Sequence, residues 1–325
     1  MEILNTLKKR LLVLGLLFLP SIFIFAQESI VPASTFEQWK SEVSNWGRWG
    51  PEDQLGTLNL ITAEKKIQAA SLVKEGKSIS LAMNLSKKKG INNGNPLIHT
   101  LGTSEQWAGD TYTINYHGYA HSHIDALCHI ALDGELYNGF SAESRKSTGV
   151  EKLGIENMSE GIFSRGILVD IPWLKNVPYL EPGTPILAKD LEAWEHKTGI
   201  EIASGDVLLI RTGRLECEKQ NGPWNYSQKA SGLHASTVSW LKERDIAVLG
   251  SDGASDLFPS GVEGQSHPVH MLVLLAMGTP ILDNLNLEEL TKHARLSNRW
   301  EFLFIGAPLR VEGGTGSPLN PIAVY

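Results

Sequence analysis

The segment "HGYAHSHIDALCHI", residues 117–130, gathers the side chains of this chain that are best suited to metal chemistry. It holds four of the ten histidines and one aspartate. His121, His123 and Asp125 occupy alternate positions, and alternate side chains of a strand point to the same face. Two imidazoles and a carboxylate are a common ligand set for a catalytic divalent metal with an open coordination position. The spacing therefore predicts a metal site built from His121, His123 and Asp125.

The same segment offers a group for proton transfer. His129 follows Asp125 by four residues, and an imidazole with an ordinary pKa of about 6.5 suits a general base or acid. His129 could instead bind a second ion. The case for His117 as a ligand is much weaker, and a surface or supporting role fits it about as well. Zinc suits the ligand set best, and manganese or iron is also compatible with it. A solvated strand face is the alternative interpretation, and three ionisable groups on one face argue against it.

The first 26 residues have the layout of a secretory signal peptide. Basic residues at positions 8–10 precede an apolar run of 15 residues, "LLVLGLLFLPSIFIF", and Ala26 supplies a small residue for cleavage. The run is shorter than the roughly 20 residues that span a bilayer, and an uncleaved anchor is the alternative. We therefore expect a secreted or periplasmic protein of residues 27–325, without membrane contact after cleavage.

Composition narrows the class of protein. The chain has 325 residues, a net charge of −7 and 42% hydrophobic residues, which is ordinary for a globular protein with a substantial core. It shows no basic block, so we expect no nucleic-acid partner. Cys128 and Cys217 could form a disulfide in an exported protein, and Cys128 could also ligate a metal. A small buried residue is the preferred interpretation for each.

Hydrophobic periodicity predicts a mixture of helices and strands. Helices are expected at 35–47, 62–75 and 187–199, and within 231–256 and 267–294. Strands are expected at 78–85, 111–125, 164–172 and 205–214, before Asp252, near Ile281 and after Trp300. Because no linker composition interrupts this pattern, residues 27–325 are expected to form one α/β domain.

The histidine segment resembles the signature H-x-G-T-H-x-D-x-P-x-H of the cyclase family of metal-dependent hydrolases, which includes bacterial kynurenine formamidase and isatin hydrolase. Alignment on the H-x-D pair places His123, Asp125 and His129 on the second histidine, the aspartate and the last histidine. Tyr119 then takes the place of the first histidine and His121 that of the glycine. We therefore predict His121 as the replacement ligand, and the choice between His121 and Tyr119 stays open.

Other segments extend the resemblance over nearly all of residues 27–325. They are "RWGPEDQLGTLNLIT", "GDVLLIRTGR", "WLKERDIAVLGSDGASD" and "APLRVEGGTGSPLNPIAV". The segment "HPVHMLVLLAMGTPILDNLNL" resembles a later part of the family and implies that His270 and Asp283 help to hold a second metal, although glutamate is more frequent at the latter position. His267 and His270 could instead pack at a helix start, and Asp252 could support a ligand or form a turn.

The resemblance implies a fold and an activity. The expected fold is a mixed α/β domain of the swivelling β/β/α kind, with a central mixed sheet or barrel-like core flanked by helices. The expected activity is arylformamidase-like hydrolysis of an amide, N-formyl, cyclic amide or ester bond, as in tryptophan catabolism. Metal-bound hydroxide attacks the carbonyl and His129 moves the proton. Isatin, lactone or cyclic imide hydrolysis is one alternative, and a non-catalytic periplasmic metal- or ligand-binding protein is another.

The expected partners are a small molecule and further copies of the chain. The resemblance favours a dimer or tetramer. An aromatic substrate would agree with the tryptophan content, for example at Trp49, Trp107 and Trp224, although core or surface packing is the better interpretation of any single one.

Overall fold

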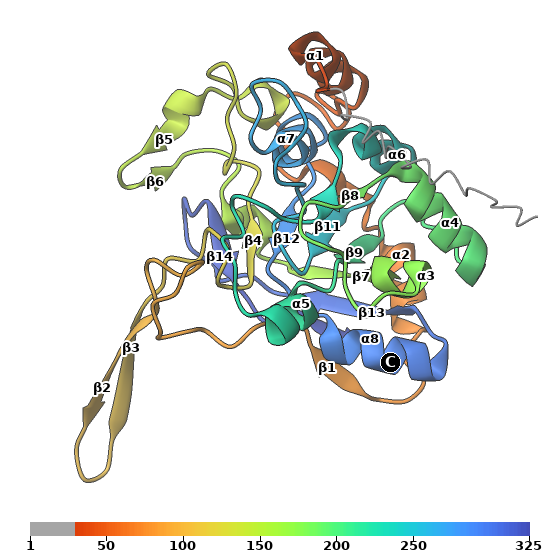
Figure 1. Ribbon diagram of the computed structural model, residues 1–325. Coiled ribbons are helices and arrows are strands. Elements are labelled where there is room, and N and C mark those ends of the chain that lie inside the picture. Colours follow the sequence, from red (N-terminus) through yellow and green to blue (C-terminus); the bar gives the residue numbers. More distant parts are fainter. Residues whose placement is uncertain (1–29) are drawn as a thin grey trace, which may run out of the picture.

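A nine-stranded mixed sheet forms the centre of the computed structural model, which describes residues 30–325 (Figure 1). The predicted signal peptide lies outside the described residues. The strand order is β1 (Ser78–Ser80), β15 (Ile322–Val324), β13 (Glu301–Gly306), β7 (Ile162–Asp170), β9 (Val207–Arg211), β11 (Val248–Ser251), β12 (Ile281–Asp283), β4 (His123–Asp125) and β14 (Gly316–Pro318).

The middle of the sheet is parallel and buried. Strands β7, β9, β11 and β12 run parallel to one another, and every residue of β9 is buried. A strand that is covered on both faces reads as a continuous apolar run, which is why the sequence predicts β7 and β9 well. The outer pairs, including β12 with β4, are antiparallel.

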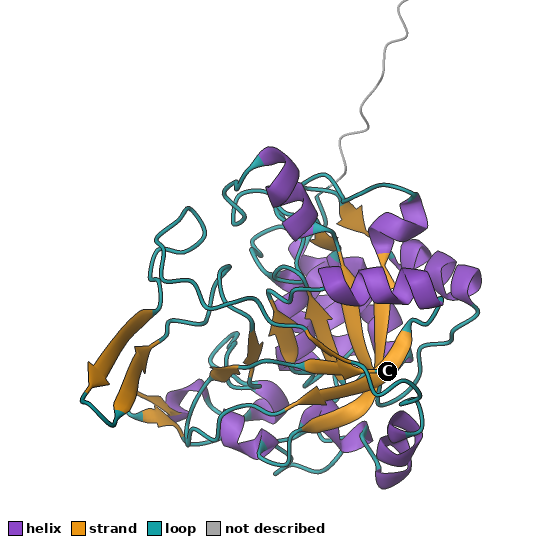
Figure 2. Ribbon diagram, turned by 90° about the horizontal axis from the view of Figure 1, so that it is seen from below, coloured by secondary structure: helices purple, strands orange, loops and turns teal. Residues whose placement is uncertain are grey.

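Helices lie around this sheet, and small two-stranded sheets lie beside it (Figure 2). The helices are α1 (Ala33–Glu42), α2 (Ala63–Ala70), α3 (Ile171–Lys175), α4 (Ala188–Thr198), α5 (Arg214–Asn221), α6 (Val238–Glu243), α7 (Pro268–His270) and α8 (Glu288–Ser297), and α7 continues as the π-helix Met271–Ala276. Short 3₁₀ helices cover Gly56–Leu60, Tyr137–Gly139, Ala142–Ser144, Ile155–Met158 and Ala235–Thr237. The small sheets pair β2 (Ile98–Thr103) with β3 (Ala108–Thr113), β5 (Arg145–Lys146) with β6 (Gly149–Val150), and β8 (Pro185–Ile186) with β10 (Gly232–Leu233).

Local signals set several element ends. The Thr62 side chain accepts a hydrogen bond from Lys65 N at 3.2 Å and caps α2 as predicted, although this helix ends at Ala70 rather than near 75. Gly199 adopts a left-handed conformation and ends α4, also as predicted. The structure confirms a mixed α/β fold around a large central sheet.

The predicted strand 111–125 is wrong, and this error matters for the site. β3 ends at Thr113, residues 117–120 form a turn, and β4 begins only at His123. Gly118 has a φ of +121°, a conformation that permits the turn and that other residues rarely adopt. The expected strand 78–85 is likewise shorter, since only Ser78–Ser80 pairs in β1. Strand alternation therefore does not extend from β4 back to residue 121.

Both cysteines, Cys128 and Cys217, are buried free thiols, so the disulfide alternative does not hold. Burial raises the pKa of the Cys128 thiol to about 12. Within residues 30–325, none of the helices combines the length and the apolar character that a membrane crossing needs. The β2–β3 hairpin projects from the body of the molecule (Figures 1 and 2) and exposes Trp107 near its tip.

Candidate metal centre

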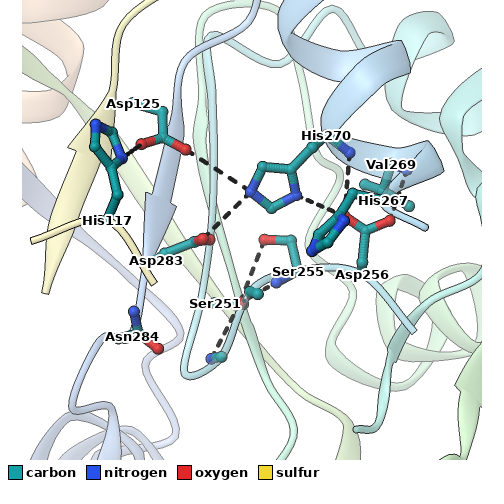
Figure 3. A network of polar contacts seen from close by, with 12 residues as sticks. His117, Asp125, Ser251, Ser255, Asp256, His267, Val269, His270, Asp283 and Asn284 are labelled. Atoms are coloured by element: carbon teal, nitrogen blue, oxygen red, sulfur yellow. Dashed lines mark hydrogen bonds and ion pairs between the residues drawn. The ribbon is translucent and has the colours of Figure 1, made fainter. Parts of the chain in front are cut away.

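Strands β4 and β12 and helix α7 bring imidazoles and carboxylates to one place (Figure 3). β4 and β12 pair antiparallel, with Asp283 directly opposite His123. Directly opposite residues share a face of the sheet, so these two side chains point to the same side. His270 approaches from α7, and the turns before and after β4 supply His117 and His129.

Two groups of potential metal donors share one carboxylate. His117, His123 and Asp125 form the first group, and Asp125, His270 and Asp283 form the second, with the donor atoms of each group within 4.8 Å of one another. Asp125 Oδ1 lies 3.0 Å from His117 Nδ1 and 3.4 Å from His123 Nε2. On the other side, Asp125 Oδ2 lies 3.8 Å from His270 Nε2. We call these the His117 group and the His270 group.

The chemistry of the donors fits a divalent cation. Asp283 Oδ1 is buried without a hydrogen bond, and the buried His117 Nδ1 and Asp125 Oδ1 meet only as an ion pair at 3.0 Å, outside hydrogen-bond geometry. Buried polar atoms are normally paired, because leaving them unpaired costs free energy. Imidazole nitrogens and carboxylate oxygens are ligands of zinc and of other first-row metals. Two converging groups of such atoms therefore fit a metal centre.

Electrostatics couples the acids and bases of the cluster. Burial alone would raise the pKa of Asp125, but the imidazoles of His129, His123 and His117 outweigh it and hold that pKa well below its ordinary value. For His270, burial would lower the pKa, and the carboxylates of Asp283 and Asp256 raise it well above its ordinary value. The cluster thus favours the ionised form of Asp125 and the protonated form of His270.

The pKa of His129 is lowered, unlike that of His270. Burial lowers the pKa of His129 to about 4, because the opposing pull of Asp125 is too weak to offset it. Its ring stacks on that of His117, with centroids 4.0 Å apart and an interplanar angle of 8°, and its Nε2 lies 3.8 Å from Asp125 Oδ2. His129 is therefore a neutral imidazole at neutral pH, with its ring held next to the shared carboxylate.

Hydrogen bonds fix which nitrogen each imidazole presents. His270 Nδ1 donates to Asp256 Oδ2 at 2.5 Å, which leaves Nε2 facing Asp125 and Asp283. His123 Nδ1 donates to the backbone oxygen of His121 at 2.8 Å, which leaves Nε2 free for the His117 group. Such outer partners fix the tautomer and the ring orientation of metal-binding histidines.

Asp256 is a functional residue that the sequence analysis missed. It is fully buried and accepts hydrogen bonds from Val269 N and His270 N as well as from the His270 ring. No sequence motif identifies Asp256, because its hydrogen-bond partners lie 13 and 14 residues further along the chain. Asp252, which the sequence left open, bonds Thr212, Gly213 and Arg214 backbone nitrogens instead and stabilises the turn before α5.

The structure places one of the expected ligands outside both donor groups. His121 belongs to neither donor group; its ring is buried and neither nitrogen has a hydrogen-bond partner. The reason is the turn before β4, which removes residue 121 from the alternation of the strand. His117 takes the place expected for His121. The structure brings the other predicted residues together, namely His123, Asp125, His129, His270 and Asp283.

A cavity of about 230 Å³ opens over the two groups. Its lining consists of His117, Gly118, Tyr119, His123, Asp125, His129, Ile130, Ala254, His267, His270 and Asp283. The Tyr119 hydroxyl lies 3.2 Å from His267 Nε2, and the Tyr119 ring packs on Tyr226 and Phe258. Neither Tyr119 nor His267 belongs to a donor group, so the two form a polar wall of the cavity.

A larger groove of about 810 Å³ lies between α5 and α8, away from the donor groups. Its arginines are already paired, because Arg211 bonds Glu288 and Asp170, and Arg295 also bonds Asp170. Size alone would favour this groove as a site, but the smaller cavity holds the reactive side chains.

Known proteins of similar sequence and fold define the family of this chain. Residues 58–255, more than half of the chain, match the family model described as "Putative cyclase". A crystal structure of a novel cyclase is 32% identical in sequence, with 87% of this chain and 99% of that chain covered and a TM-score of 0.80. The chain belongs to the cyclase family. The resemblance predicted from the histidine segment is thereby confirmed.

Solved structures of lower sequence identity share the fold. Isatin hydrolase A from Ralstonia solanacearum is 20% identical, with 77% of this chain and 92% of that chain covered and a TM-score of 0.55. Isatin hydrolase A from Labrenzia aggregata, bound to benzyl benzoate, is 18% identical, with 78% and 94% covered and a TM-score of 0.56. No curated protein matches the chain.

Proposed function

We propose that this cyclase-family protein is a metal-dependent hydrolase of small amides, with N-formyl amides of aromatic amines as the first candidate substrates. One observation carries the proposal: the His117 group and the His270 group share Asp125 at the base of a cavity, and three of their donor atoms are buried without a hydrogen bond. Such a polar cluster in a small cavity supports metal-assisted hydrolysis better than a purely structural role.

The residues that would hold the metal follow from the two groups. His117, His123 and Asp125 would hold one ion, and Asp125, His270 and Asp283 a second. Zinc suits the mixed nitrogen and oxygen donors best, and manganese is the alternative. A divalent ion held there supplies Lewis acidity, which polarises a carbonyl group and makes water more acidic.

His129 would move the proton. As a neutral imidazole beside Asp125, it can accept a proton from water as that water attacks a carbonyl carbon, and can then give the proton to the leaving nitrogen. Its stacking on His117 holds the ring in one orientation. Asp256 would keep His270 in the required tautomer. His129 is therefore the general base, and Asp256 a positioning residue.

The cavity wall limits the substrate. A volume of about 230 Å³ admits a small molecule, and the Tyr119 ring, backed by Tyr226 and Phe258, offers an aromatic surface with a hydroxyl at its edge. A planar aromatic substrate with a carbonyl group fits such a surface. The ring-opening of a cyclic amide is the second candidate, favoured by the fold shared with isatin hydrolases.

Metal analysis and a substrate panel test the proposal. The purified protein should contain zinc or manganese and should hydrolyse N-formylkynurenine, isatin or a small lactone. Chelator should abolish turnover, and added Zn²⁺ or Mn²⁺ should restore it. His129→Ala should lose turnover and keep its metal, whereas His196→Ala, an exposed histidine on α4, should behave like the wild type.

Two outcomes would contradict the proposal. Hydrolysis that persists in metal-free protein would exclude the metal mechanism. Bound metal without turnover on any member of the panel would favour the non-catalytic binding protein.

A further inference from the structure

Two buried side chains hold the turn that precedes β4. Asn284 Nδ2 donates to the backbone oxygens of Gly118 at 2.7 Å and His121 at 3.2 Å. Arg214 Nη2 donates to the backbone oxygen of Tyr119 at 2.7 Å. Three carbonyl groups of one turn are thus bound by two side chains from elsewhere in the chain.

Asn284 and Arg214 also bind each other. Arg214 Nη1 donates to Asn284 Oδ1 at 2.7 Å, and both residues are buried. The backbone of Asn284 is fixed on both sides, because its nitrogen donates to Gly253 O at 2.8 Å and its oxygen accepts from Ser122 Oγ at 2.6 Å. We call this pair the Arg214–Asn284 clamp.

The guanidinium group of the clamp has little freedom to move. It lies 4.2 Å over the ring of Tyr226, and its Nε bonds Glu218 at 3.2 Å. The backbone nitrogen of Arg214 bonds the buried carboxylate of Asp252 at 3.1 Å. A planar guanidinium with several fixed donors suits a rigid role of this kind better than a lysine would.

The clamp connects residues that serve the two metal groups. The turn that it holds carries His117 and Tyr119, and Asn284 directly follows Asp283 of the His270 group. β12 is itself held by backbone pairing with β4 and β11, whereas the 117–122 turn lies outside any strand. Loss of the clamp should therefore disturb His117 and Tyr119 more than Asp283.

We infer that Arg214 and Asn284 are positioning residues that set the place of His117 and Tyr119 relative to the His270 group. This inference rests on the proposed function, because it gives the clamp a role in metal binding and substrate placement. A clamp with only a structural role would affect the stability of the fold and leave the affinity of each metal group unchanged.

Three variants test the clamp. Asn284→Gly removes the side chain and tolerates the φ of +55° at this position. Arg214→Lys keeps the charge and removes the fork of donors. The control Thr57→Val removes a buried hydroxyl that donates to Ala247 O at 2.8 Å, outside the metal cavity. Thermal unfolding of the metal-free proteins records the cost in stability, and Zn²⁺ titration against a competing chelator records the two affinities.

In both clamp variants the affinity of the His117 group for its ion should fall by about 10- to 100-fold, the range typical of lost outer partners of a metal site, while the affinity of the His270 group changes less. The value of kcat/KM should fall in parallel. Thr57→Val should lose stability and keep both affinities. If Asn284→Gly does not fold, Arg214→Lys decides.

Two results overturn the inference in distinguishable ways. Clamp variants that bind both ions as the wild type does, at any cost in stability, refute the positioning role alone. A wild-type protein that binds no ion refutes the proposed function and the role of the clamp with it.

Discussion

His117 and His121 lie four residues apart, and only one of them faces the metal cavity. Neither ring nitrogen of the buried His121 has a partner, and His121 belongs to neither donor group. His121→Leu should therefore leave metal affinity unchanged. His117 Nδ1 lies 3.0 Å from the shared carboxylate, so His117→Leu should weaken metal binding strongly.

The expected magnitudes follow from these environments. A buried polar group without a partner costs about 1–3 kcal/mol, and an apolar replacement of similar size removes that cost. We expect His121→Leu to raise the free energy of unfolding by up to about 2 kcal/mol. Each kcal/mol should raise Tm by about 2–4 °C. Loss of an outer partner alone costs a metal site about 10- to 100-fold in affinity. Loss of His117 itself should cost at least about 100-fold, which equals about 2.8 kcal/mol.

The two variants need two measurements. Titration with Zn²⁺ against a competing chelator gives the affinity, and urea unfolding of metal-free protein gives the stability. His196→Ala is the control for removal of an imidazole far from the cavity. A loss of metal affinity in His121→Leu equal to that in His117→Leu would refute the geometric argument. So would unchanged affinity in His117→Leu.

Further predictions concern other residues of the site and the chain. Asp256→Asn should keep the fold and lower the affinity of the His270 group by about 10- to 100-fold, measured by chelator competition; unchanged affinity would contradict its orienting role. The pKa of His129 is about 4 in the folded protein and about 6.5 in the unfolded chain. Between about pH 4 and 6.5 the unfolded chain therefore binds more protons at this residue than the folded protein does. The free energy of unfolding of metal-free protein should therefore rise with pH across this window. In His129→Gln, the free energy of unfolding measured by urea titration should rise less steeply with pH. Cys128, with a pKa of about 12, should resist alkylation at pH 8 in the folded protein and react in denaturant, as peptide mass spectrometry can follow; rapid alkylation of the folded protein would contradict its burial. We also propose export with cleavage after Ala26, and N-terminal sequencing of protein from the periplasm or medium checks it.

Much of the fold could be predicted because its signals are local. The continuous apolar runs of β7 and β9 identify buried strands, and Thr62 and Gly199 mark helix ends through their own side-chain or backbone chemistry. The failure at 111–125 has a non-local cause. The β-forming residues there are interrupted by a turn whose carbonyls bind side chains 95 and 166 residues away.

The candidate site could likewise be predicted only in part. His123, Asp125 and His129 follow from spacing within one segment, and the resemblance of the segment 267–287 to a later part of the family adds His270 and Asp283. Asp256, Arg214 and Asn284 act through contacts that only the folded chain creates, and no sequence pattern announces them. The exchange of His121 for His117 has the same origin, because a turn replaced the strand on which the alternation depended.

The sharing of Asp125 by both donor groups has a thermodynamic consequence. One carboxylate cannot be reoriented for the first ion without changing what it offers to the second. Binding of two ions, as proposed above, would therefore be linked, and the factor by which either ion changed the affinity for the other would be the same in both directions. Binding of one ion should thus change the affinity for the other. The concentration of free metal at which one ion binds would then depend on whether the other is already in place.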